Sequence, residues 1–460
     1  MKTKKVTIDF NWKNISHQAW SISLDMYLEK IKFENILKGK FDEEWISKAI
    51  QHTKWDLFLQ QIRWYMQGYS NTTELSRTVN DPLNTKIAWI KIASQPTFSR
   101  FQTSLKEADL LKLKDIQKVI ISQYLTRMVK KNWWKKIKEL EISDDSTKII
   151  TYGKQEWSSY ISHYNIVGYH PDLVTEDGMR LVIEGVLRNG NVYSSNGSEL
   201  LIESAINFLK PYVEKIIFKW DSAYGKPEIL DVLDDTWIEV DAYIKAKTYE
   251  GWFANNDQKV SFNWVDYLIL DLPKDYFEER NELWETVLVP RYFTIKHQCK
   301  SRSKEENIVC KVERREVDWI SLFAVANKNV EMLIVRWALR GKEAFEKYGK
   351  RGKQEQIIEE LKNEMFVKNL SHTKKIQNSC EFYMKIIAYN LMQILRLETL
   401  HWTVHKNCRI NTTRRLVFDI WGKIVEHARS VRIQLAESFP FQKRFNLVME
   451  RIPKIQFRLC

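Results

Sequence analysis

The sequence predicts a mixed α/β core with helical regions on both sides of it. Three observations support this fold class. Apolar residues recur at helical spacing through residues 1–110. Strand-like and helical segments then alternate from residue 141 to 247, and residues 248–335 are strand-like and rich in aromatic side chains. From residue 336 to residue 460 the pattern is again mainly helical.

The charge of the chain indicates a polyanionic partner. Its 460 residues include 72 Lys and Arg against 59 Asp and Glu, a formal net charge of +13. Such an excess favours nucleic acid or an anionic membrane surface. No apolar run reaches the ~18 residues of a membrane span, and no apolar stretch follows the basic N-terminus as it would in a signal peptide. We therefore expect a nucleic-acid partner, no membrane association, and a cytoplasmic location.

The cysteines and histidines do not predict a structural metal centre. The five cysteines are scattered and contain no C-x-x-C pair, which fits a reducing compartment. His401, His405 and Cys408 have the helical spacing that zinc could use, but no fourth ligand is evident. An ordinary helix surface is the preferred interpretation of this cluster.

A short polar helix is expected near the end of the N-terminal region. Ser94 is placed to cap it, and a proline lies in its first turn. The helix carries Gln95, Thr97, Ser99 and Arg100, whose side chains are of the types that contact base edges and phosphates. Such a helix is also a common structural element. The chemistry alone therefore leaves DNA recognition and a purely structural role equally open.

The order of the remaining elements predicts a ribonuclease H-like mixed sheet. Residues 111–140 are a basic amphipathic segment, expected to be a helix that connects the N-terminal region to the core. Within the core, 141–247, three strands precede a helix, a strand, a helix and a strand, which is the ribonuclease H-like succession. A β-rich insertion follows at 248–335, then a return to the core at 336–400 and a helical C-terminal region at 401–460. The first three strands are expected at "KIITYG", "RLVIEGVL" and "NVYSS", with a hairpin turn at "RNG".

One stripe of polar side chains stands out in the helix expected from about residue 340 to 366. At about 100° per residue, Tyr348, Arg351, Glu355 and Lys362 share a stripe of ~60°. A solvated helix has no reason to align an acid, two bases and a phenol so narrowly. Two glycines interrupt the stripe, so its first turn is expected to fray until DNA is bound.

Three acidic residues are candidates for phosphodiester chemistry. Two-metal cleavage needs hard oxygen ligands that converge from separate elements. Asp145 lies at the first expected strand, Asp221 ends the fourth, and Glu355 lies on the following helix. Each aspartate alone could be a turn former. The neighbouring Asp144 should point to the opposite sheet face, so Asp145, directly before Ser-Thr, is the preferred residue.

Several stretches together carry a resemblance to a known family. They are "ASQPTFSRF", "DSTKIITYGKQE", "GYHPDLV", "RNGNVYSSNG", "WDSAYG" and the signature Tyr-x2-Arg-x3-Glu-x6-Lys. With them the chain resembles bacterial insertion-sequence transposases of the DDE class, specifically the insertion-sequence-1380 family, over nearly its whole length. One departure is the bulky Trp157 after "KQE", where relatives usually carry small residues.

The resemblance implies specific roles. Asp145, Asp221 and Glu355 would hold two Mg²⁺ or Mn²⁺ ions, and the other three residues of the signature would contact phosphates of the transposon end. Base-stacking aromatics in the insertion are a further expectation, with Trp319 and Trp252 as candidates, although a core position is the commoner role for tryptophan.

The function implied is cut-and-paste transposition of the element that encodes the protein. The enzyme would bind double-stranded terminal inverted repeats, cleave the ends, with a DNA hairpin as one route, and join the 3′-hydroxyls to target DNA at the nucleoid. Two ends must be brought together, so a homodimer is expected. The alternatives are a metal-dependent nuclease without strand transfer and a transposase-derived DNA-binding regulator. The intact acidic triad argues against the regulator.

Overall fold

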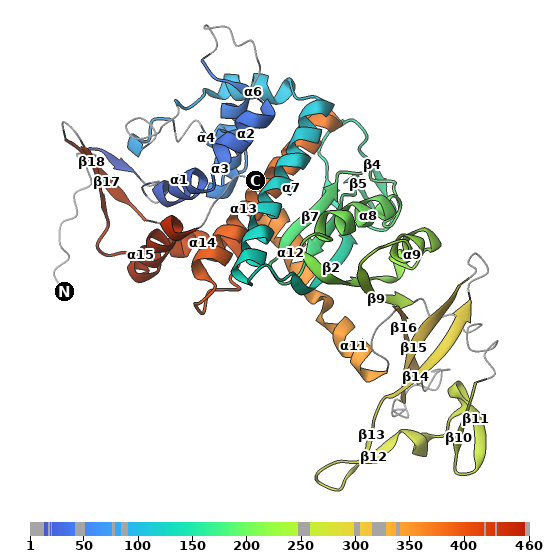
Figure 1. Ribbon diagram of the computed structural model, residues 1–460. Coiled ribbons are helices and arrows are strands. Elements are labelled where there is room, and N and C mark those ends of the chain that lie inside the picture. The colour runs from blue at the N-terminus through green and yellow to red at the C-terminus, as the bar shows by residue number, and fades with distance from the viewer. Residues whose placement is uncertain are drawn as a thin grey trace, which may run out of the picture.

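An eight-stranded mixed sheet forms the centre of the computed structural model (Figure 1). The structure describes residues 13–16, 19, 21–41, 51–75, 79–83, 91–246, 258–298, 304–314, 328–336, 341–417, 420–427 and 430–455. The strand order in the sheet is β14-β15-β16-β9-β8-β2-β6-β7. Its strands are β2 (Ile137–Ser146), β6 (Asp172–Glu176), β7 (Leu181–Val186), β8 (Val213–Trp220), β9 (Glu239–Ala246), β14 (Arg291–Gln298), β15 (Glu305–Arg314) and β16 (Lys328–Arg336).

The expected succession of elements is present in one half of this sheet. Strands β2, β6 and β7 form an antiparallel meander. Helix α8 (Ser198–Leu209) then leads to β8, which is parallel to β2, and helix α9 (Pro227–Asp234) leads to β9, which is parallel to β8. Three antiparallel strands followed by β/α alternation thus build the part of the sheet that carries the candidate acidic residues.

The expected first strands, however, were partly wrong. "KIITYG" contributes only the two-residue β3 (Ile149–Ile150) to a small separate sheet with β4 (Ser159–Ile161) and β5 (Ile166–Tyr169). The hairpin turn lies between β6 and β7 instead of at "RNG", and residues 191–195 form a loop.

Buried Arg188 explains why this loop is not a strand. Its guanidinium donates hydrogen bonds to the carbonyls of Ser194 and Asn196, 2.7 and 2.8 Å away. The loop carbonyls are therefore satisfied without a neighbouring strand. Gly190 packs so closely on the small sheet that a Cβ there would lie 2.2 Å from the Ser159 carbonyl.

The β-rich insertion is partly continuous with the core. Strand β16 pairs with β9, from Met332 opposite Ala246 to Arg336 opposite Ala242, so β14, β15 and β16 extend the central sheet. Two smaller hairpins lie beyond this edge (Figure 1). They are β10 (Lys259–Phe262) with β11 (Val265–Leu268), and β12 (Glu278–Arg280) with β13 (Thr286–Leu288).

Helix α13 (Lys375–Leu400) is the central helix and is buried along almost its whole length. It packs against α7 (Glu107–Lys131), α3 (Lys54–Gln67) and β7. Side chains from α7 and α13 also cover the outer edge of β7, because Gln117 and Asn390 both donate hydrogen bonds to the carbonyl of Val182. Polar side chains that occupy an edge strand prevent it from pairing with another chain.

The other helices complete the two helical regions. The N-terminal region contains α1 (Ser21–Lys30), α2 (Phe33–Phe41), α4 (Thr72–Leu75) and α6 (Gln95–Thr103); later in the chain come α11 (Lys342–Gly349), α12 (Lys353–Asn363), α14 (Ile410–Val417) and α15 (Gln442–Arg451). Within the described part of the chain, no helix combines the length and apolar character that a membrane crossing requires.

Two expectations about helical segments need correction. The segment 111–140 is not helical throughout, since α7 ends at Lys131, where Trp133 and Trp134 adopt positive φ angles, and β2 begins at Ile137. The C-terminal region contains a hairpin of β17 (Gly422–His427) and β18 (Ser430–Leu435). Strand β1 (Ile15–Ser16) pairs with β17, so a small sheet joins the N-terminal and C-terminal regions.

Candidate active site

Asp145 and Asp221 lie side by side at one end of the central sheet. The parallel register of β2 and β8 places Ser143 opposite Lys219. Asp145 follows Ser143 by two residues and Asp221 follows Lys219 by two residues, so both carboxylates emerge at the same end of neighbouring strands. Topology therefore brings together two acids that are far apart in the sequence.

Arg351 lies between these two carboxylates. Its Nη2 is 3.7 Å from Asp145 Oδ2, and its Nη1 is 3.9 Å from Asp221 Oδ2. The Tyr348 hydroxyl is near the same guanidinium: burial raises the pKa of Tyr348, and the Arg351 charge acts to lower it. One cation thus faces two anions, and the local charge of these three side chains is negative.

The polypeptide that carries Arg351 is not the single helix expected from the sequence. Helix α11 ends at Gly349, a 3₁₀ turn (Lys350–Gly352) follows, and α12 begins at Lys353. The two glycines that interrupt the stripe are in this break, where the absence of a side chain lowers the preference for α-helix. The angles of one ideal helix therefore do not apply across the signature.

Burial and neighbouring charge both act on the Asp145 carboxyl. Burial, with the charges of Asp221 and Asp172, raises the pKa of Asp145 to about 6, although the Arg351 guanidinium opposes this. The adjacent Asp144 is completely buried beside Asp172, and burial is the main reason why its pKa is raised. Asp145 is the more accessible of the two neighbours and the one that faces Arg351.

Two lysines add positive charge around Asp145. Burial and the charge of Lys148 lower the pKa of Lys362, while the Asp145 charge acts to raise it. The two amines are therefore close enough to repel each other and close enough to Asp145 to be attracted. Together with Arg351, the two lysines form a positively charged environment that suits a phosphate group. Lys148 was missed in the sequence, where its only signal is a position three residues after Asp145.

Glu355 is less closely integrated than the other signature residues. It lies on the first turn of α12 and is exposed. The preceding Gln354 is buried and donates a hydrogen bond to the carbonyl of Leu173, which pairs with Asp145 across β2 and β6. Yet no group of three His, Cys, Asp or Glu side chains in the described ranges is arranged to hold a metal ion. The structure brings Asp145, Asp221, Tyr348, Arg351 and Lys362 together, without Glu355.

The donor set nevertheless fits hard divalent cations. Asp145 and Asp221 present carboxylate oxygens, which Mg²⁺ and Mn²⁺ prefer as ligands. The Asp221 charge is one of the causes that raise the pKa of Asp145, and the Arg351 guanidinium lies between the two carboxylates. A divalent cation bound between the strand ends would be held by the oxygens of these two carboxylates.

A buried ion pair holds α12 in place. Glu360 is completely buried and pairs with Arg180, which follows β6, while Gln393 on α13 donates to its other oxygen at 3.1 Å. Removing either partner of a buried pair leaves an uncompensated charge. The position of α12 against the sheet and α13 is therefore strongly specified. Its only sequence signal is a glutamate among the apolar positions of α12.

The expected DNA-reading helix is α6. It begins at Gln95 with Ser94 in the cap position, and buried Phe98 anchors it to the N-terminal core. Gln95, Ser99 and Arg100 are exposed, whereas Thr97 is half-buried and its hydroxyl lies 2.9 Å from that of Ser94.

The remaining sequence candidates are the two tryptophans of the insertion and the cluster of His401, His405 and Cys408. Trp252 and Trp319 lie outside the described residues. The helical face expected for the histidine and cysteine cluster does not form, because α13 ends at Leu400 and turns follow through residue 407. The Cys408 thiol instead lies 3.3 Å from the Thr413 hydroxyl.

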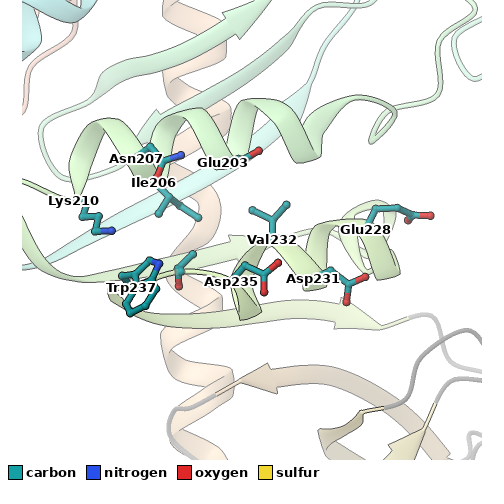
Figure 2. A pocket seen from close by; sticks show the side chains of 10 residues that line it. Glu203, Ile206, Asn207, Lys210, Glu228, Asp231, Val232, Asp235 and Trp237 are labelled. Carbon is teal, nitrogen blue, oxygen red and sulfur yellow. The ribbon is translucent and has the colours of Figure 1, made fainter.

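A separate pocket of about 230 Å³ lies between α8 and α9 (Figure 2). Its walls carry the carboxylates of Glu203, Glu228, Asp231 and Asp235, with Lys210 at one end. Negative walls repel a phosphate backbone. This pocket is therefore not a candidate for DNA binding.

Comparisons with known proteins give a family match and a distant structural likeness. A family model described as transposase DDE domain group 1 matches residues 1–457. Among solved structures, the chain is similar to the piggyBac transposase synaptic complex with hairpin DNA, determined by cryo-EM, with 11% sequence identity and a TM-score of 0.39 over 81% of this chain and 74% of that chain. No curated protein sequence matches the chain. The family match spans nearly every residue, whereas the structural likeness is distant.

Proposed function

Because the family match runs from residue 1 to residue 457, the chain belongs to the transposase DDE domain group 1 family, and we propose that it is the cut-and-paste transposase of its own insertion sequence, within the insertion-sequence-1380 family. DDE transposases are enzymes that bind DNA and cleave and transfer its strands, and in general they use divalent metal ions. The single observation that supports the proposed site most strongly is the convergence of Asp145 and Asp221 on Arg351.

The catalytic core is proposed to be ribonuclease H-like. Its support is the antiparallel meander of β2, β6 and β7, followed by the parallel strands β8 and β9 with their helices. In such an arrangement a carboxylate on the first strand and one after the fourth strand lie together. Asp145 and Asp221 occupy those positions.

Asp145, Asp221 and Glu355 are proposed to hold two Mg²⁺ or Mn²⁺ ions. When bound, such ions supply an activated water or 3′-hydroxyl and stabilise the departing oxygen. Asp145 and Asp221 provide ligand oxygens from two fixed strand ends. Glu355 is the proposed third ligand because it follows Arg351 in the signature and begins the helix that packs on β2 and β6.

The basic side chains are proposed to bind the phosphates beside the cut. Arg351 can exchange its contacts with the two carboxylates for a phosphate, because guanidinium forms strong charge-assisted hydrogen bonds with either anion. Tyr348, whose pKa is influenced by the Arg351 charge, would lie beside the guanidinium during the exchange. Lys362 supplies a second positive charge from α12.

The DNA partner is proposed to be the terminal inverted repeat of the element, with target DNA as the second substrate. Gln95, Thr97, Ser99 and Arg100 on α6 would contact the repeat. Two ends must be joined in one event, so a homodimer in the synaptic complex is proposed. Release of the element through a hairpin is suggested by the resemblance to transposases with the same signature.

One experiment tests this function directly. The protein is incubated with end DNA, a target plasmid and Mg²⁺, and both cut positions and joined products are mapped. Cleavage at the element boundary and joining to the plasmid are expected. Cleavage without joining would identify a nuclease, and end binding without cleavage would identify a DNA-binding regulator.

A further inference from the structure

Two lysines that follow the aspartates in the sequence, Lys148 three residues after Asp145 and Lys226 five residues after Asp221, each pack against a tyrosine ring. Near Asp145, the Lys148 amine lies 4.4 Å from the centroid of the Tyr164 ring. In the second pair, the Lys226 amine lies 4.9 Å from the centroid of the Tyr193 ring. Neither pair belongs to the signature.

The first pair is close to Asp145 in space as well as in sequence. The charge of Asp145, after burial, is the second cause that raises the pKa of Tyr164, so the ring lies in the field of that carboxylate. Lys148 also lies near the amine of Lys362. This lysine and tyrosine thus border the proposed phosphate site.

The second pair is attached to the first through the loop that replaces the expected strand. The His170 ring is 6.2 Å from the Tyr164 ring, and its Nδ1 lies 2.9 Å from the carbonyl of Val192, next to Tyr193. Lys226 donates to the side chain of Asn196 at 2.8 Å, near the end of the same loop. The two pairs are therefore connected through this loop, and the first pair lies beside Asp145.

The loop is rigidly supported. The Arg188 guanidinium, which holds the loop carbonyls, also lies 3.0 Å from the buried carboxylate of Asp172. Nearly half of the Tyr193 side chain, 49%, is nonetheless exposed. An aromatic ring held at the surface on a well-supported loop is suited to binding because little further ordering is required.

We propose that Tyr164 with Lys148 and Tyr193 with Lys226 bind the unpaired nucleotides next to the phosphate that is cut. Single-stranded DNA is bound by combining positive charge for its backbone with aromatic rings for its bases, and each pair contains both. Bases inside a duplex are stacked on each other and offer no free face, so these rings gain a base only where pairing has been opened. This inference rests on the proposed function of the site.

The test compares two forms of the end DNA, one fully paired and one with two mismatched nucleotides at the cut position. Binding is measured in EDTA, so that no cleavage occurs. The wild-type protein is expected to prefer the mismatched form about tenfold, in line with the contribution of base–aromatic stacking. Tyr193→Ala and Tyr164→Ala should bring this preference close to one while affinity for fully paired end DNA is kept. Tyr193→Phe should retain it.

Tyr160→Ala is the matched control. Tyr160 is more exposed than Tyr193 and lies on the neighbouring β4, and its hydroxyl donates to Asn165. This variant should keep the wild-type preference. If Tyr164→Ala does not fold, the test relies on Tyr193→Ala and Lys226→Gln. Both of these variants alter the second pair.

The outcomes separate this inference from the proposed function. An equal affinity of wild-type protein for both DNA forms, or a preference that survives Tyr193→Ala, would overturn the inference while Mg²⁺-dependent cleavage of end DNA still supported the function. A protein that bound end DNA no better than scrambled DNA would overturn both.

Discussion

The Arg351 guanidinium lies 3.7 Å from the Asp145 carboxylate, although 206 positions separate the two residues in the chain (351 − 145). This contact places the 3₁₀ turn between α11 and α12 directly over the end of β2. In the proposed mechanism the guanidinium neutralises carboxylate charge before DNA arrives and phosphate charge afterwards.

The acidic residues should be required for cleavage and dispensable for binding. Asp145→Asn, Asp221→Asn and Glu355→Gln keep side-chain size and remove the charge that a hard divalent cation needs. Each should abolish Mg²⁺-dependent cleavage of end DNA, measured on a denaturing gel, and leave its affinity nearly unchanged, since affinity comes mainly from Lys and Arg contacts to phosphate.

Glu359→Gln is the control for the third carboxylate. Glu359 lies one turn beyond Glu355 on α12, is exposed, and pairs with Arg409 at 2.6 Å. It should retain full cleavage. Loss of cleavage in this variant alone, with normal cleavage by Glu355→Gln, would move the third ligand to residue 359.

Arg351→Ala should affect binding and cleavage together. The variant removes the proposed phosphate contact and also leaves Asp145 and Asp221 without the cation they share. We expect end-DNA affinity to fall by about tenfold, the effect of one lost charge-assisted contact, with cleavage reduced at least as much. Filter binding and gel assays on the same preparation provide both values, and a loss of cleavage with unchanged affinity would contradict the phosphate role.

Arg100→Ala should reduce sequence preference. A lost base contact costs about 1–3 kcal/mol and lowers specificity at one position, whereas a lost phosphate contact weakens binding to all DNA alike. Footprints on end DNA and scrambled DNA distinguish these cases. Thr103→Ala, at the last turn of the same helix, removes a hydroxyl that bonds to the backbone of α6 and should leave the footprint unchanged.

The buried pair of Glu381 and Lys385 on α13 should cause much of the decrease in the free energy of unfolding at acid pH. Burial acts to raise the pKa of Glu381, but the Lys385 charge and His372 lower it to about 2. The unfolded carboxyl titrates higher, so the stabilisation is fully present above the unfolded pKa and is lost as the pH falls toward about 2. Urea unfolding, followed by circular dichroism between pH 6 and pH 3, should show this loss, and Glu381→Gln should reduce it.

Lys385→Ala should destabilise the protein strongly at neutral pH. It would leave Glu381 buried without its closest cation, 2.8 Å away, at a cost of about 3–5 kcal/mol in the free energy of unfolding. Lys38→Ala removes a lysine from an exposed pair with Glu34 and should change this free energy by less than about 1 kcal/mol. Equal effects of the two variants would show that the α13 pair contributes little.

Local sequence alone determined much of this protein. The order of strand-like and helical segments predicted α8 and α9, and Ser94 with the proline after it predicted the start of α6, because such signals act over a few residues. The excess of Lys and Arg indicated a polyanionic partner, and the spacing from Tyr348 to Lys362 indicated a shared site. The glycines at 349 and 352 signalled a weak helix but did not reveal a complete break.

Tertiary structure decided which side chains meet. The parallel register of β2 and β8 brings Asp145 beside Asp221, and pairing of β16 with β9 makes part of the insertion an extension of the central sheet. Residues 191–195 have strand-like side chains but form a loop, because the buried Arg188 guanidinium donates hydrogen bonds to the loop carbonyls. In this loop Tyr193 lies beside Lys226. These features depend on hydrogen bonds and packing between segments distant in sequence, and such contacts can override local preference because they supply most of the stabilising free energy.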